Sequence, residues 1–101
     1  MYRRILRGQL QPGLHAAFIS AVRETAEYQR RSGILTQVSV WYPSTGQTNR
    51  FEIASEFEDL GELQKFDNLV DTDGRFAELR RQVMAQVVFG SVEVEIQRQV
   101  M

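Results

Sequence analysis

The sequence predicts an α+β fold in which the elements follow one another as β-α-β-β-α-β. Four segments, residues 2–10, 34–42, 50–57 and 88–96, alternate apolar with polar side chains, as strands with one buried face do. One long segment lies between the first and second of these strands and another between the third and fourth. Both repeat apolar residues at the period of an amphipathic helix. Right-handed crossovers then give a four-stranded antiparallel sheet in the order 4-1-3-2 with the helices on one face, a ferredoxin-like sandwich.

The first half of the chain marks the ends of its elements clearly. The first strand ends at Gln11-Pro12-Gly13, because proline fixes φ and glycine frees it. From Leu14 the apolar residues take helical spacing, and Gly33 follows basic residues at the expected end of this helix. Residues 34–42 are rich in β-branched and aromatic side chains, and the loop 43–48 turns the chain back into the third strand.

The second helical region is expected to be broken in two. Asp59 stands three residues before Glu62, the spacing of a capping box, and predicts a helix start there. The run Asp71-Thr72-Asp73-Gly74 interrupts this helix, and a further helix is expected from Arg75. The last strand follows this helix.

The two faces of the predicted sheet differ in character. The helices are expected to cover the apolar parity, which holds Leu6, Leu10, Val38, Val40, Phe51, Ile53, Val92 and Val94. The other parity, called the open face below, mixes charges with large apolar groups: Arg3, Ile5, Arg7, Gln37, Ser39, Trp41, Arg50, Glu52, Glu56, Phe89, Glu93 and Glu95. A solvated face seldom carries Trp, Phe and Ile, and a buried core seldom carries so many charges. We therefore predict a homodimer in which a second copy covers the open face.

Two other interpretations of the open face remain. A solvated face on a monomer is one, with Trp41 shielded by loops. An RNA-binding sheet is the other, but the outward positions of the central strands carry Arg3, Ile5, Arg7, Glu52 and Glu56 instead of the aromatic residues on which bases stack. Strand order also brings basic and acidic strands together, so Arg3 and Arg7 are expected to meet glutamates across strands.

Length and composition indicate a single domain, residues 1–101, in a soluble and cytoplasmic protein. The hydrophobic fraction is 43%, and the formal net charge of −1 argues against a nucleic-acid or anionic-membrane partner. The absence of cysteine excludes disulfides and thiolate metal sites, and with one histidine a metal site is not expected. No cofactor is expected. No apolar run approaches the roughly 20 residues that a membrane span needs.

No catalytic constellation is recognisable, so enzymatic activity stays open. His15 is interpreted as a surface residue, with a general base or haem ligand as the alternative, and Tyr42 as a core residue. Arg7, Trp41, Glu52 and Glu93 are the candidates for lining a ligand chamber, because they share one parity around an aromatic residue. An enzyme would need a closed cavity of about 300 Å³ or more with convergent polar groups.

Several segments resemble the NIPSNAP-like family. Arg4-Ile5-Leu6-Arg7 leading into Gln11-Pro12-Gly13 is similar to the family's first strand and its break. Gly46-Gln47-Thr48-Asn49, a strand and Phe57-Glu58-Asp59-Leu60-Gly61-Glu62 resemble the family's G-x-x-N, strand and aromatic/D-L-x-E run. Asp73-Gly74-Arg75-Phe76 is similar to its D-P-x-W segment. The resemblance spans residues 4 to 96.

The sequence departs from the family at four positions. Gly74 replaces the usual proline, Phe76 the usual tryptophan, and Ile53 and Ser55 stand in the strand where His and Trp are common. The resemblance extends to the superfamily of dimeric α/β barrels, which includes antibiotic-biosynthesis-type monooxygenases. It implies a homodimer that binds a small apolar molecule between sheet and helices; the alternative is a small cofactor-independent enzyme of the monooxygenase or isomerase type.

Overall fold

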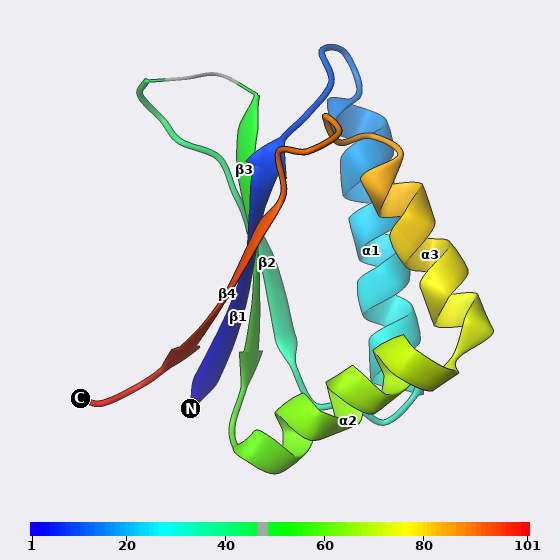
Figure 1. Ribbon diagram of the computed structural model, residues 1–101, viewed down its shortest axis with the longest axis vertical. Helices are drawn as coiled ribbons and strands as arrows, with labels where there is room; N and C mark the ends of the chain where they lie inside the picture. Colours follow the sequence, from blue (N-terminus) through cyan, green and yellow to red (C-terminus); the bar gives the residue numbers. More distant parts are fainter. Residues whose placement is uncertain (47–48) are drawn as a thin grey trace.

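The computed structural model describes residues 1–46 and 49–101, and its elements follow the predicted order (Figure 1). They are β1 (Tyr2–Gln9), α1 (His15–Arg31), β2 (Gln37–Trp41), β3 (Arg50–Phe57), α2 (Leu60–Thr72), α3 (Gly74–Met84) and β4 (Glu93–Arg98). Gln47 and Thr48, within the predicted loop and the G-x-x-N motif, lie outside the described residues.

The four strands form one antiparallel sheet in the order β2-β3-β1-β4, which confirms the predicted order. β1 occupies an inner position, with β3 on one side and β4 on the other. In this register Arg7 lies opposite Glu52 of β3 and opposite Glu93 of β4. The three side chains therefore share one face of the sheet, as the alternation of the sequence predicts.

The helices form a layer on the other face. Figure 1 shows α1 and α3 side by side along the sheet, while α2 crosses one end of it. One cluster of buried side chains centres on Phe18 and Phe51, whose ring centroids are 4.7 Å apart. A second cluster contains Phe57, Phe66 and Phe76, all with 3% exposure or less. The aromatic side chains thus hold the helix layer to the sheet.

Aspartates begin the two short helices, and this explains the predicted break between them. The Asp73 carboxylate accepts a hydrogen bond from the Phe76 amide at 2.9 Å and another from the Tyr28 hydroxyl at 2.7 Å. Asp59 accepts from the Glu62 amide at 2.9 Å. The Glu62 carboxylate accepts from the Leu35 amide at 3.0 Å, so it fixes the loop before β2 to α2. Of the two hydrogen bonds of the expected capping box, the one accepted by the Asp59 side chain is present. The Glu62 side chain bonds to Leu35 instead.

The second strand is shorter than predicted. It begins at Gln37, because the chain before it is used to bury Ile34 against the second aromatic cluster. Tyr42, expected in the core, lies beyond the strand and is 41% exposed. Its hydroxyl hydrogen-bonds with Nδ1 of His15 at 2.7 Å, which places the single histidine at the protein surface.

The last strand begins later than predicted, at Glu93 instead of residue 88. Val87 forms an isolated bridge with Leu10, and the chain then turns at Gly90, where φ is +80°. Phe89 lies in this turn with its side chain fully exposed, so its assignment to the open face of a strand is wrong. The expected cover over Val92 and Val94 is also missing, because the helices do not reach β4: these residues are 38% and 51% exposed.

Candidate functional site

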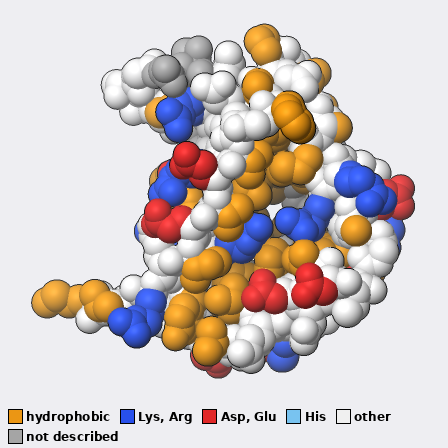
Figure 2. All heavy atoms as spheres, in the orientation of Figure 1, with side chains coloured by type: hydrophobic (Ala, Val, Ile, Leu, Met, Phe, Trp, Pro, Cys, Tyr) orange, Lys and Arg blue, Asp and Glu red, His pale blue; other side chains and the backbone are white. Residues whose placement is uncertain are grey.

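A cavity lies between the sheet and the helix layer. Its volume is about 60 Å³, above the roughly 10–15 Å³ that a single water molecule requires. Figure 2 shows the hollow between the two layers, with hydrophobic side chains on its walls and basic side chains beside its opening. Apolar residues from both layers line it, Leu6, Val38, Ile53, Val83 and Met84 among them. The walls are therefore suited to a small apolar group.

Arg4 brings a positive charge into this cavity from the sheet. Side chains of β1 alternate between the two faces, so Arg4 shares the helix-facing side with Leu6. Its side chain is half-buried, and the guanidinium carbon lies 5.1 Å from the centroid of the Phe66 ring. Cation–π attraction favours this position of the guanidinium.

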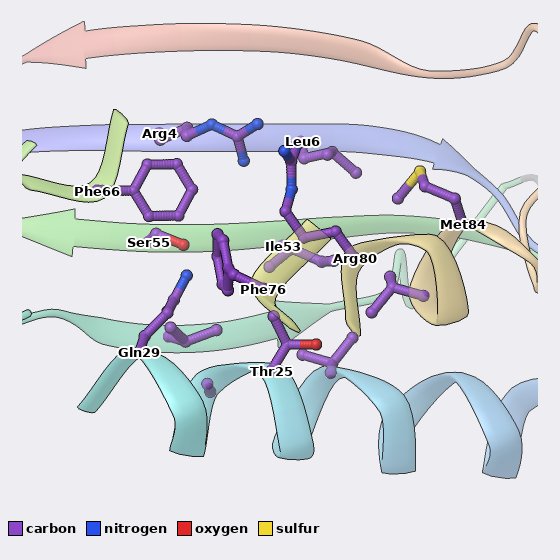
Figure 3. Close-up of a pocket in the computed structure, with 14 residues that line it drawn as sticks. Arg4, Leu6, Thr25, Gln29, Ile53, Ser55, Phe66, Phe76, Arg80 and Met84 are labelled. Carbon is purple, nitrogen blue, oxygen red and sulfur yellow. The ribbon is translucent and has the colours of Figure 1, made fainter. Parts of the chain in front are cut away.

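Arg80 brings a second positive charge from α3. Its guanidinium carbon lies 6.0 Å from the centroid of the Phe76 ring, and the Phe66 and Phe76 rings are 5.8 Å apart. Figure 3 shows the side chains of Arg4 and Arg80 extending toward each other across the cavity. Burial lowers the pKa of Arg4, and the charge of Arg80 lowers it further, while the charge of Asp67 raises it by a smaller amount. Since arginine stays protonated in proteins, two like charges face one another here.

Two buried polar side chains complete the lining. Gln29 of α1 is 5% exposed and Ser55 of β3 is 4% exposed. In the described chain the Oε1 atom of Gln29 is buried without a hydrogen-bond partner. Figure 3 shows the side-chain amide of Gln29 pointing from α1 toward the cavity. A buried amide without its hydrogen bonds is costly, so this side chain is available to a ligand.

The predicted site residues lie on the open face of the sheet and not in this cavity. Arg7 donates to the Glu52 carboxylate, and its Nη1 lies 3.4 Å from an Oε2 atom of Glu95. The hydrogen bond that Arg7 donates to Glu52 raises the pKa of Arg7, whereas the hydrogen bond from Gln97 and then the charge of Arg7 lower the pKa of Glu95. The predicted cross-strand pairing of Arg7 with glutamates is therefore confirmed. Arg3 instead donates to the amide oxygen of Gln97.

Three of the four predicted chamber residues come together on this face. Arg7, Trp41 and Glu52 line an open hollow of about 500 Å³, whereas Glu93 lies opposite Arg7 in the register outside that hollow. Trp41 is 62% exposed and donates from its indole nitrogen to the Ser39 hydroxyl. All four side chains lie on the face away from the helices, so the helix layer does not enclose them.

Ile5 differs from its predicted state on the open face. Its side chain is only 4% exposed in a single chain, because it lies between the longer side chains of neighbouring positions. Ala54, directly opposite on β3, is buried in the same way. The burial of Ile5 therefore needs no partner. Trp41 remains the large apolar side chain of the strands exposed on this face.

Sequence reasoning missed Arg4 and Arg80 as site residues, although both left a signal. Arg4 stands on the apolar parity of its strand, where a charge is unexpected. Arg80 stands four residues after Phe76, on the buried face of its helix. A charge on a buried face needs a partner, so both residues indicate a polar site between the sheet and the helices.

Two other features are absent from the described residues, a metal site and a membrane-spanning helix. The residues that the structure describes include no group of His, Cys, Asp and Glu side chains placed to hold a metal ion. Within the same residues, no helix has the length and apolar character needed to cross a membrane.

The chain has a ferredoxin-like fold, and this fold is similar to those of solved NIPSNAP and antibiotic biosynthesis monooxygenase structures. No family model matches its sequence, and no curated protein matches it significantly. The resemblance therefore rests on the fold.

Three solved structures illustrate this likeness. SnoaB, a cofactor-independent oxygenase from Streptomyces nogalater, superposes with a TM-score of 0.76 at 12% identity, over 99% of this chain and 93% of that one. A NIPSNAP domain protein from Burkholderia xenovorans gives 0.72 at 9% identity, over 99% and 95%. A NIPSNAP family protein of unknown function from Agrobacterium tumefaciens gives 0.71 at 16% identity, over 96% and 86%.

Proposed function

We propose that this protein is a homodimeric binding protein that holds a small molecule with an apolar body between its sheet and its helices. The observation that carries this proposal is the cavity between the layers, where Gln29 Oε1 has no hydrogen-bond partner and Arg4 and Arg80 have no ion-pair partner within the described chain. Its volume of about 60 Å³ suits a molecule of a few non-hydrogen atoms, or a larger one whose remainder extends through the opening.

The homodimer part of the proposal rests on the open face. Basic side chains (Arg3, Arg7, Arg50) and acidic ones (Glu52, Glu56, Glu93, Glu95) alternate over it, so a second copy presents matching charges under a two-fold axis. Exposed Trp41 supplies the kind of aromatic anchor that concentrates binding energy at interfaces. In such a dimer the partner would cover Arg7, Trp41, Glu52 and Glu93, and these residues would line a chamber between the two sheets.

A cofactor-independent enzyme is the second candidate, favoured by the likeness of the fold to that of SnoaB, a cofactor-independent oxygenase. The composition of the cavity favours binding over proton-transfer chemistry. Its described lining includes Arg, Gln, Ser and Thr side chains but no Asp, Glu, His or Tyr that could accept a proton from a substrate. The cavity is also smaller than the roughly 300 Å³ typical of ligand pockets.

Binding in the cavity can be tested with isobutyramide, a small neutral molecule with an apolar end. In a titration followed by NMR amide shifts, we expect changes in β1, α1 and α3 around the cavity, with a dissociation constant in the millimolar range. Ala26→Leu should abolish these changes, because Ala26 lines the cavity. Ala16→Leu on the exposed side of the same helix is the matched control. Shift changes confined to the open face, or none, would contradict the proposal.

A further inference from the structure

The cavity is positively charged, and its lining offers more hydrogen-bond donors than acceptors. Arg4 and Arg80 contribute two guanidinium groups, and the described lining includes no carboxylate. Neither guanidinium forms an ion pair or a side-chain hydrogen bond within residues 1–46 and 49–101. The other charged pairs of the protein, such as Arg7 with Glu52, are satisfied internally. Arg4 and Arg80 are thus charged groups that the fold brings together without an ion-pair partner among the described residues.

The position of the two guanidinium groups is fixed by aromatic packing. Phe66 lies under Arg4 and Phe76 under Arg80, and the two rings contact each other edge to face. Both rings are buried, at 3% and 0% exposure. The buried rings therefore favour the positions of both guanidinium groups beside the cavity.

Gln29 adds an independent indication of a ligand. Its side chain is 95% buried, lines the same cavity and has an unpartnered amide oxygen. Oxygen and nitrogen of a glutamine amide exchange places on a flip of the side chain, so this group can present a donor or an acceptor to a ligand. Together with the Ser55 hydroxyl it provides neutral hydrogen-bonding groups beside the two charges.

We infer that the ligand of this cavity is a small organic carboxylate, whose carboxylate group lies between Arg4 and Arg80 and whose apolar part contacts Leu6, Val38 and Met84. This inference rests on the proposed function and specifies its ligand. A carboxylate accepts paired hydrogen bonds from a guanidinium and offsets the mutual repulsion of the two arginines. The apolar walls disfavour a compact inorganic anion, because such an ion would have to leave its water shell without gaining enough polar contacts.

The test compares isobutyrate with isobutyramide, which have the same shape and differ in charge. At neutral pH and low salt we expect isobutyrate to bind at least about tenfold more tightly, because hydrogen bonds to a charged group are the stronger ones. The Nε–Hε signals of Arg4 and Arg80 should shift with isobutyrate and report the contact directly. Added salt should weaken isobutyrate binding and leave isobutyramide binding unchanged.

Variants identify the groups responsible. Arg4→Met and Arg80→Met keep an apolar stem and remove the charge, so each should reduce the preference for isobutyrate to about threefold or less. Arg81→Met, an exposed arginine next in sequence, is the matched control and should keep the full preference. Circular dichroism checks that each variant is folded, and the comparison of the two probes on the unaltered protein stands even where a variant fails to fold.

The outcomes separate this inference from the proposed function. Equal binding of both probes in the cavity would overturn the carboxylate inference and leave a binding protein for neutral molecules. Binding of isobutyrate at another basic site, mapped by shifts near Arg3 and Arg98, would also overturn it. Binding of neither probe would overturn both proposals.

Discussion

The backbone at Gly74 has the conformation and the space that a proline needs at the start of a helix. It is the first residue of α3, where the amide has no acceptor within the helix. The residue before it, Asp73, has φ −102° and ψ 110°, an extended conformation that a following proline accepts. A Cβ added at Gly74 would meet no atom within 4 Å. The position therefore meets the requirements of a helix-starting proline.

We predict that Gly74→Pro stabilises the protein by about 0.4–1 kcal/mol, because it restricts the unfolded chain without straining the folded one. Urea unfolding followed by circular dichroism measures this change. Gly90→Ala is the contrasting variant: φ is +80° at Gly90, so a side chain there should lower stability by about 1–2 kcal/mol. A loss of stability in Gly74→Pro would mean that the Gly74 amide is needed for a hydrogen bond.

The residue scale also shows where sequence reasoning succeeds and where it fails. Alternation along β1 correctly placed Arg7 on the open face beside glutamates. The same alternation put Arg4 on the apolar side, but it gives no information about which inward side chains remain uncovered. That depends on how far the helices stand from the sheet, which follows from the packing of Phe66 and Phe76 and not from any local pattern.

At the scale of elements, the order and type of every helix and strand follow from the sequence, while several ends do not. The start of β4 is the clearest case. Residues 88–92 alternate like a strand, yet the bridge between Val87 and Leu10 and the turn at Gly90 occupy this segment first. Over five residues, a strand and a turn that contains apolar residues can have the same sequence pattern. Only the tertiary pairing distinguishes them.

The start of α3 yields a prediction about acid. Hydrogen bonds from the Phe76 amide and then from the Tyr28 hydroxyl lower the pKa of Asp73 below its ordinary value of 3.8. A carboxyl whose pKa is lower in the folded state stabilises the protein above its unfolded pKa. That contribution is lost as the pH falls from about 4 through the folded pKa.

We expect Asp73→Asn to lose less stability than the unaltered protein between pH 5 and pH 2, since Asn still accepts the cap hydrogen bonds but does not titrate. Thermal unfolding at a series of pH values measures this difference. Asp71→Asn, an exposed residue two positions earlier, is the matched control. Equal pH dependence in Asp73→Asn and the unaltered protein would show that the cap does not contribute to acid stability.

At the scale of the whole molecule, the oligomeric state decides whether the open face is covered. We predict a dimer at low micromolar concentration, measured by light scattering over a dilution series. Trp41→Ser should weaken it at least about tenfold, because Trp41 is the exposed aromatic residue that the strands place on the proposed contact. Leu35→Ser removes a side chain of similar exposure (68%) outside the four strands and is the control. A monomer at all concentrations would instead indicate a solvated open face.

The inner position of β1 has a consequence for the protein while it is being made. β1 is synthesised before β3 and β4, and its second edge can pair only after β4, which follows the other three strands of the sheet in sequence. At 5–20 residues per second, the roughly 40 residues between Phe57 and Arg98 take about 2 to 8 s to be added. During that interval β1 exposes an unpaired edge in every nascent chain. Arg3, Arg4 and Arg7, spaced along this strand, give neighbouring nascent chains the same charge and so oppose their pairing.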